Sequence, residues 1–272
     1  MQEHLLDFYH ADLAFIGPPF TPTEDKDLIA IRNRAKFVWT QPELDDCGEV
    51  LGTIGNSSSW RELCTYRKSP SRIFQFLGGV KNCHEGSSGI LLAYRYLTLQ
   101  KILQTSIVDD YDWIIYTSAD YTYLCSPLPL SYFSSDYVYV LNSQGFGGIT
   151  DRHTYIPRKF VTRVFNITEH IVINSKFRLN KLCSSDDKNI RKFNLERTIL
   201  WYFNFVGIPF KRFWHPAFTV KRDEDPTRWQ EGHVHHIMNK YTLKVKYPGE
   251  VDEANISCDP WKRFFMTHPL PH

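Results

Sequence analysis

The stretch SGILLAYRYLTLQKILQTSIVDDYDWIIYTSAD, residues 88–120, decides the class of fold. Its first part repeats apolar and aromatic side chains at helical spacing behind Ser88, which predicts a helix over 88–104. Its last part, residues 112–120, reads as a buried central strand that ends on the carboxylate of Asp120. A helix that leads into a buried strand is the repeating step of α/β proteins, in which ligands bind beyond the carboxyl ends of the strands. Asp120 is therefore placed for chemistry.

The same alternation continues on both sides of this stretch. Upstream, the pattern predicts strands at 11–17, 36–40 and 71–77 and helices at 25–35 and 57–66. Downstream, it predicts extended runs at 137–142 and 208–220, a glycine turn at 145–148, and helices at 157–165 and 195–207. From residue 221 the chain is polar, and we expect a tail that wraps the sheet. The fold class is thus a single α/β domain over 1–272 with a mostly parallel sheet flanked by helices.

Charge and hydropathy argue against two classes of protein. The 32 basic and 30 acidic residues give a net charge of +2, which leaves no basic excess for a polynucleotide. The longest apolar run, residues 199–210, is shorter than the roughly 20 residues of a membrane-spanning helix. We expect neither nucleic-acid binding nor a membrane span, and the sequence leaves the oligomeric state open.

The N-terminus and the cysteines indicate a compartment. The first residues carry acidic and histidine side chains where a signal peptide has a cationic start and an unbroken apolar run. The cysteines form no C-x-x-C pair, so we expect reduced, structural thiols at Cys47, Cys64, Cys83, Cys125, Cys183 and Cys258. The sequons at Asn56, Asn166 and Asn255 are then expected to be unused. The expectation is a cytoplasmic protein, or a segment of something longer.

Ser118 and Asp120 form the first candidate site. Residues two apart on a strand share a face, so this hydroxyl and this carboxylate would point at one ligand. A hard cation that bridges a diphosphate needs only one or two protein carboxylates, because phosphate and water supply its other ligands. The alternative is that Asp120 only caps the turn that precedes Pro127 and Pro129.

A strand followed by Ser-Ala-Asp and then by YTYLCSPLP, residues 121–129, resembles the D-x-D region of GT-A-fold glycosyltransferases. The chain is similar to the compact enzymes of chlorella viruses, some of which look like xylosyltransferases. The resemblance covers roughly residues 10–220 and implies a Rossmann-like fold with a nucleotide-sugar half over about 10–130 and an acceptor half over about 131–220. The first Asp of the motif is Ser118 here, so Asp120 is the one certain carboxylate.

The resemblance also implies ligands. Asp120 would hold a divalent ion, Mn²⁺ or Mg²⁺, on the diphosphate of a UDP-sugar, and Ser118 would contact the ribose or the water of the ion. The uracil and ribose would lie where the first two predicted strands end, at 15–19 and at 38–41, which includes Thr40. The chain has neither G-x-x-x-x-G-K-[ST] nor G-x-G-x-x-G, so a kinase-like or dinucleotide site is not supported.

The segment GFGGITDR, residues 145–152, resembles the acceptor loop of the same family. Glycines let the backbone approach a ligand closely, and an Asp-Arg pair can bind sugar hydroxyls or a phosphate. Gly147, Gly148 and Arg152 are therefore candidate acceptor-binding residues. The alternative is a glycine turn between strands with a surface ion pair.

Two acids are candidates for the catalytic base. Inverting sugar transfer needs a carboxylate that accepts the proton of the attacking hydroxyl, and Glu196 and Asp151 occupy positions that resemble this role. We prefer Glu196 slightly. Its alternative role is to stabilise the first turn of its helix through the helix dipole.

Two features near the C-terminus give weaker signals. His215, with Lys221 and Arg222 nearby, could meet a leaving diphosphate, although a solvated basic strand end explains it more simply. The histidines of HVHH, residues 233–236, lack a carboxylate or thiol at ligand spacing and are expected in a surface loop.

These patterns lead to one expected function and two rivals. The expectation is a metal-dependent glycosyltransferase that moves a sugar, best guess xylose from UDP-xylose with inversion, onto a glycan hydroxyl. Bulky side chains at Tyr121, Tyr123 and Phe146 would exclude the hydroxymethyl group of a hexose. The rivals are a non-catalytic carbohydrate-binding module on the same fold, suggested by the missing first Asp, and a nucleotide-sugar hydrolase.

Overall fold

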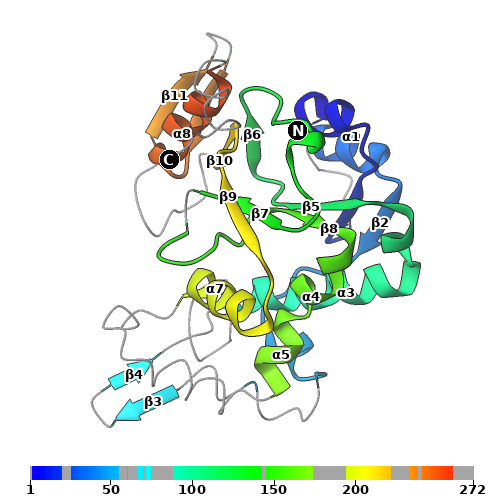
Figure 1. Cartoon of the computed structure of the whole chain (residues 1–272), viewed down its shortest axis with the longest axis vertical. Coiled ribbons are helices and arrows are strands. Elements are labelled where there is room, and N and C mark those ends of the chain that lie inside the picture. Colours follow the sequence, from blue (N-terminus) through cyan, green and yellow to red (C-terminus); the bar gives the residue numbers. More distant parts are fainter. Residues whose placement is uncertain are drawn as a thin grey trace.

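The structure, a computed structural model, describes residues 2–19, 26–54, 60, 66–69, 72–74, 88–142, 145–173, 194–221, 233–237 and 241–259. Helices and strands alternate along the chain, and the helices pack against sheets (Figure 1). The expected α/β class is confirmed.

The central sheet has four strands in the order β5-β8-β7-β9. These strands are β5 Trp113–Thr117, β8 His153–Pro157, β7 Val138–Leu141 and β9 Phe210–Phe213. β8 runs antiparallel to both of its neighbours, and only β7 and β9 are parallel. The expectation of a mostly parallel sheet is therefore wrong. The connection from β7 to β8 holds a short turn and no helix, and a parallel crossover needs about a dozen or more residues, usually a helix.

β5 is shorter and more peripheral than the sequence suggests. It ends at Thr117, its residues are half-buried, and in the described sheet it has a partner on one side only. Ser118 and Asp120 consequently lie in a turn beyond the strand, before β6 Tyr121–Tyr123. The expectation of a buried central strand through Asp120 is wrong.

Four helices cover one face of this sheet. Figure 1 shows them together beneath the strands: α3 Ser88–Thr105, α4 Val161–Phe165, α5 Ile167–Ile173 and α7 Leu195–Val206. Val138, Val140 and Ile156 point to these helices and are fully buried. The space between the sheet and these helices holds the main core. The helices expected at 88–104, 157–165 and 195–207 are confirmed, with a 3-10 turn Arg158–Phe160 that opens the second of them.

The opposite face of the sheet is lined by aromatic side chains. Tyr139 and Tyr155 alternate with the residues that face the helices, as strand geometry requires. They pack with Tyr121, Phe133 and Phe213. Leu5 of the N-terminal π-helix, Gln2–Asp7, belongs to the same cluster, so the start of the chain covers this face.

The N-terminal elements form a small parallel pair beside the central sheet. β1 Ala14–Gly17 and β2 Phe37–Thr40 are joined by α1 Lys26–Arg34, as the sequence predicts. Lys36 donates to Asp12 over 2.8 Å and to the Tyr111 hydroxyl over 3.0 Å. Because Tyr111 lies just before β5, these contacts join the pair to the central sheet.

Three short elements complete the first half of the chain. α2 Gly48–Leu51 was not expected, and a 3-10 turn, Ile107–Asp110, follows α3. β4 Arg72–Phe74 lies within the expected strand 71–77, but it pairs with β3 Tyr66–Ser69 in a separate antiparallel hairpin. The helix expected at 57–66 lies mostly outside the described residues, and its last residue, Tyr66, begins β3.

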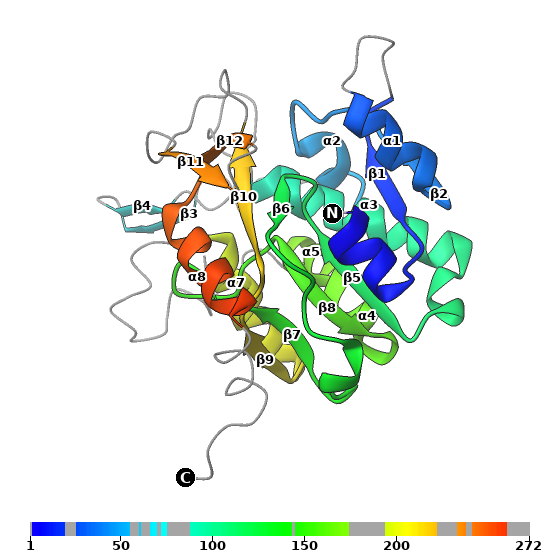
Figure 2. The same ribbon diagram turned by 90° about the horizontal axis from the view of Figure 1, so that it is seen from above.

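The chain beyond residue 217 builds a second sheet, so the expectation of a tail that only wraps the first one is wrong. Its order is β11-β12-β10-β6, and all described pairings in it are antiparallel. The three added strands are β10 Ala217–Lys221, β11 His233–Ile237 and β12 Tyr241–Val245. The 233–236 histidines thus lie in a strand, not in a loop. α8 Pro248–Cys258 follows and packs on β10 (Figure 2).

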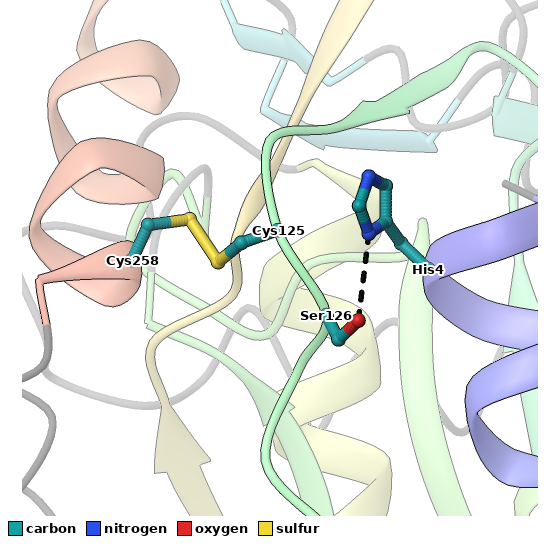
Figure 3. The surroundings of a disulfide bond; sticks show 4 residues. All are labelled: His4, Cys125, Ser126 and Cys258. Atoms are coloured by element: carbon teal, nitrogen blue, oxygen red, sulfur yellow. Dashed lines mark hydrogen bonds between the residues drawn. A yellow bond between two sulfur atoms is a disulfide. The ribbon is translucent and has the colours of Figure 1, made fainter.

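A disulfide joins Cys125, just after β6, to Cys258 at the end of α8. Figure 3 shows that the neighbouring residue Ser126 meets His4 of the N-terminal helix, at 3.4 Å between Oγ and Nδ1. The expectation of reduced thiols is therefore wrong for this pair, while Cys47 is free and buried. Cys64, Cys83 and Cys183 lie outside the described residues. The expected compartment stays a prediction.

Among the described helices, none combines the length and the apolar character needed to cross a membrane.

Candidate functional site

Asp120 lies in the turn between β5 and β6 and is held from two sides. The Ser118 hydroxyl donates to Asp120 Oδ1, and the Ser118 amide donates to the Arg152 carbonyl over 2.9 Å. The Val220 amide of β10 donates to the Asp120 carbonyl over 2.9 Å. The other carboxylate oxygen, Oδ2, is 3.9 Å from Lys246 Nζ, and the Asp120 side chain is 38% exposed. Ser118 and Asp120 therefore lie together in one turn and bond to each other, and the ligand that the sequence predicts for them stays a prediction.

The glycine turn brings the second sequence motif to the start of α7. Gly147 has φ +86°, and a side chain there would meet the Arg197 guanidinium at 2.8 Å. At Gly148 a Cβ would fall 2.1 Å from the carbonyl carbon and oxygen of Glu196. The Ile149 amide donates to that same carbonyl oxygen over 2.9 Å. Both glycines are thus required for the contact between this turn and the start of α7, Gly148 against Glu196 and Gly147 against Arg197.

Asn194 fixes the first turn of α7. Its Oδ1 accepts from the Arg197 amide over 2.9 Å, which is a standard N-cap, and its Nδ2 donates to the Phe146 carbonyl over 3.0 Å. The cap therefore also attaches the helix to the glycine turn. Sequence reasoning missed Asn194, although Asn followed by the apolar helix 195–207 is a recognisable start signal.

The carboxyl of Glu196 has a raised pKa. Burial, and after it the negative charge of Asp151, raise this pKa to about 7 against the opposite effects of a backbone hydrogen bond and of the positive charge of Arg152. These influences show that the three groups share one electrostatic environment. A carboxyl with a pKa near 7 is half ionised at neutral pH and can exchange protons there.

Asp151 is buried, with 8% exposure, between the two motifs. Its carbonyl accepts from Arg95 of α3 over 2.9 Å, and the guanidinium of Arg95 lies 5.0 Å from the Tyr116 ring centre. The long predicted helix therefore holds the Asp151 backbone in place. The sequence placed Arg95 on this helix without assigning it a role.

The Arg152 side chain contacts β10 and the start of α8. Its guanidinium donates to Thr219 Oγ1 over 3.0 Å and to the Tyr247 hydroxyl over 2.7 Å, and it lies 3.6 Å from Glu250 Oε1. The acceptor-binding role expected of Arg152 stays a prediction, but these contacts already occupy the side chain. Lys246, Tyr247 and Glu250 were missed because the sequence around them reads as a polar tail. Pro248 and Glu250 in a first helical turn are the signal that could have found α8.

Two expected site residues lie elsewhere. Thr40 ends β2, where it pairs with Gly17, and Figures 1 and 2 both show β2 and α8 well apart, on the right and on the left of the molecule. Arg222 lies outside the described residues. Their expected roles in nucleotide binding stay predictions.

His215 is not the solvated strand end that the sequence suggests. It is 4% exposed, and its ring centre is 3.9 Å from that of His153. Burial lowers the pKa of His215 well below its usual range and that of His153 to about 3, so both rings are neutral at physiological pH. Tyr121 and Tyr123, expected near a sugar, instead enclose this pair, whereas Phe146 is 52% exposed.

The donor atoms around Asp120 fit one kind of metal site. In the part of the chain that the structure describes, no three His, Cys, Asp or Glu side chains converge to hold an ion by themselves. The partly exposed Asp120 carboxylate and the Ser118 hydroxyl suit an ion that takes most of its ligands from phosphate oxygens. Asp120 could supply one carboxylate ligand to such an ion, whereas the described residues form no metal centre by themselves.

Comparison of this chain with protein-family models, with curated proteins and with solved structures gave no significant match.

Proposed function

We propose that this protein is a glycosyltransferase of GT-A type that uses a nucleotide-sugar donor. The observation that carries the proposal is the pair Asp120 and Glu196: a partly exposed carboxylate beside a hydroxyl, and a second carboxyl whose pKa burial raises to about 7. The glycine turn and Asp151–Arg152 lie between them. Sugar transfer needs these two functions, a site for the diphosphate and a base for the acceptor.

In this proposal Glu196 takes the proton of the acceptor hydroxyl as that oxygen forms its bond to the sugar. The sugar leaves the diphosphate in the same displacement, so the configuration at its anomeric carbon inverts. Asp151 keeps the proton affinity of Glu196 high through its negative charge. A divalent ion bound with the donor would be held by Asp120 and would neutralise charge on the diphosphate.

Donor binding gives the first test. UDP with manganese at 100 times its dissociation constant should stabilise the fold by about 2.7 kcal/mol, measured as a shift in melting temperature. Asp120→Ala should lose this shift. Asp136→Ala is the matched control, because Asp136 also pairs with a lysine, at 2.7 Å, but on an exposed surface. Equal shifts in the parent and in Asp120→Ala would reject the site.

The non-catalytic binding module has one observation in its favour. Lys246 Nζ, at 3.9 Å from Asp120 Oδ2, supplies a positive charge where a metal-dependent enzyme places its ion. Donor consumption separates the candidates. A transferase consumes a UDP-sugar only when a glycan acceptor is added, a hydrolase consumes it alone, and a binding module does neither.

The sugar and the stereochemistry form the most specific part of the proposal: UDP-xylose as donor and a β-linked product. The test offers UDP-xylose, UDP-glucose and UDP-galactose with a fucose- or glucose-bearing acceptor and assigns the new linkage by NMR. An α-linked product, or a preference for a hexose donor, would contradict it.

A further inference from the structure

Glu250 is a buried carboxylate in the first turn of α8, with 2% exposure. Its Oε2 accepts from the Thr219 amide over 2.6 Å, and its Oε1 lies 3.6 Å from Arg152 Nη1. Burial raises the pKa of this carboxyl, whereas the hydrogen bond from Thr219 and the charge of Arg152 favour its ionised form. A buried carboxylate is costly unless it is paired, so its two partners identify what it holds.

Both partners of Glu250 are connected to Asp120 through hydrogen bonds of neighbouring residues. Thr219 precedes Val220, whose amide donates to the Asp120 carbonyl. The Arg152 carbonyl accepts a hydrogen bond from the Ser118 amide, and the Ser118 hydroxyl donates to the Asp120 carboxylate. One side chain of α8 is thus connected to each of the two backbone segments that fix Asp120.

α8 is seated by apolar packing and by the disulfide. Val251 and Ala254 pack against Phe218 and Val245 in a small core of their own. At the far end of the helix, Cys258 is bonded to Cys125, just beyond the β6 strand that follows Asp120 (Figure 3). The helix is therefore attached next to β6, the strand that pairs with the β10 strand that its buried carboxylate contacts.

We infer that Glu250 is a positioning residue for Asp120, which acts through Arg152 and the Thr219 amide. The consequence for donor use rests on the proposed function, but the connection between α8 and the Asp120 turn does not. Tyr247 shares the task, because it accepts from Arg152 and its ring lies 4.5 Å from the guanidinium carbon.

The test compares Glu250→Gln and Glu250→Ala with Asp252→Asn, which also removes a carboxylate from α8 but at an exposed position. Glu250→Gln keeps an acceptor for the Thr219 amide and loses the charge opposite Arg152. Amide hydrogen exchange at Ser118 and Val220 reports on the Asp120 turn without any ligand. Exchange at both should become about tenfold faster or more in the Glu250 variants and stay unchanged in Asp252→Asn.

The kinetic readout separates positioning from a general loss of stability. Glu250→Gln should raise KM for the nucleotide sugar about tenfold and leave KM for the acceptor unchanged. Unchanged exchange at Ser118 in Glu250→Gln would overturn the inference even if Glu250→Ala fails to fold. If the parent protein neither binds UDP nor consumes a donor, the proposed function fails, and the exchange result still decides the role of Glu250.

Discussion

The segment from β5 to β8 and the segment from β12 to α8 meet at Arg152 but are held there in different ways. Except for β6, the strands of the first belong to the central sheet, and the main core and the long helix α3 lie beneath them. The second rests on a four-residue core, on side-chain contacts to Arg152 and on one disulfide. The difference teaches that one part of the site is built into the scaffold, whereas the other is docked onto it and can be altered separately.

The largest expected effect is on the scaffold side. Glu196→Gln should lower turnover about 10²- to 10⁴-fold and keep UDP binding, because it removes the base. In the parent, kcat/KM should rise with pH through about 7 as Glu196 loses its proton. Asp151→Asn should keep more of the turnover and move this rise to lower pH, because the charge of Asp151 raises the pKa of Glu196. Rate profiles of the two variants against pH check this, and near-normal turnover in both would remove these acids from the mechanism.

The next effect concerns the docked segment. Replacing Cys125 and Cys258 together by Ser should lower the free energy of unfolding by about 2–5 kcal/mol. In the protein that stays folded, kcat/KM for the donor should fall, mainly because KM for the donor rises, since α8 carries Glu250. Denaturant melts with donor kinetics provide the measurement. A variant as stable as the parent would mean that apolar packing alone seats α8.

Two glycines give a matched pair with a smaller effect. Gly148→Ala should destabilise the fold by about 1–3 kcal/mol, because its Cβ would fall 2.1 Å from the Glu196 backbone. Gly249→Ala in α8 has open space around it and should stabilise by about 0.5–1 kcal/mol. Melting temperatures of the two proteins decide. Equal shifts in melting temperature would show that the glycine turn accommodates a Cβ atom as easily as α8 does.

A further effect is the pH dependence of the scaffold. Burial lowers the pKa of His153 and of His215 in the folded state. Below pH 6.5, the ordinary pKa of histidine, the unfolded chain therefore binds more protons than the folded one. The contribution of the two rings to the free energy of unfolding is therefore fully present above about pH 6.5. It falls as the pH drops, by up to about 1.4 kcal/mol per pH unit for each ring. His215→Phe should flatten this slope between pH 6.5 and 5, and an unchanged slope would show that the rings are not buried and neutral.

Local pattern predicted much of the first half of the chain and of the scaffold side of the site. The helix at 88–104, the strands that lie within 11–17 and 36–40, and the turn at 145–148 follow from apolar spacing and glycine placement, which act within a few residues. For the same reason the sequence could indicate Ser118, Asp120, Asp151 and Glu196. It could not give the direction of β8 or the edge position of β5, because pairing between strands depends on the length and path of the connections.

The sequence by itself determined the α/β class, the helix and the strand that precede Asp120 and the kinds of side chain available for chemistry. Only the tertiary structure decided that Glu196 lies against Gly148, that His215 is buried, and that Glu250 reaches Arg152. Burial and charge at these positions come from segments far apart in the chain, and the disulfide between Cys125 and Cys258 spans 133 residues. Such contacts leave no periodic signal in the sequence, because they are selected by packing and not by local backbone preference.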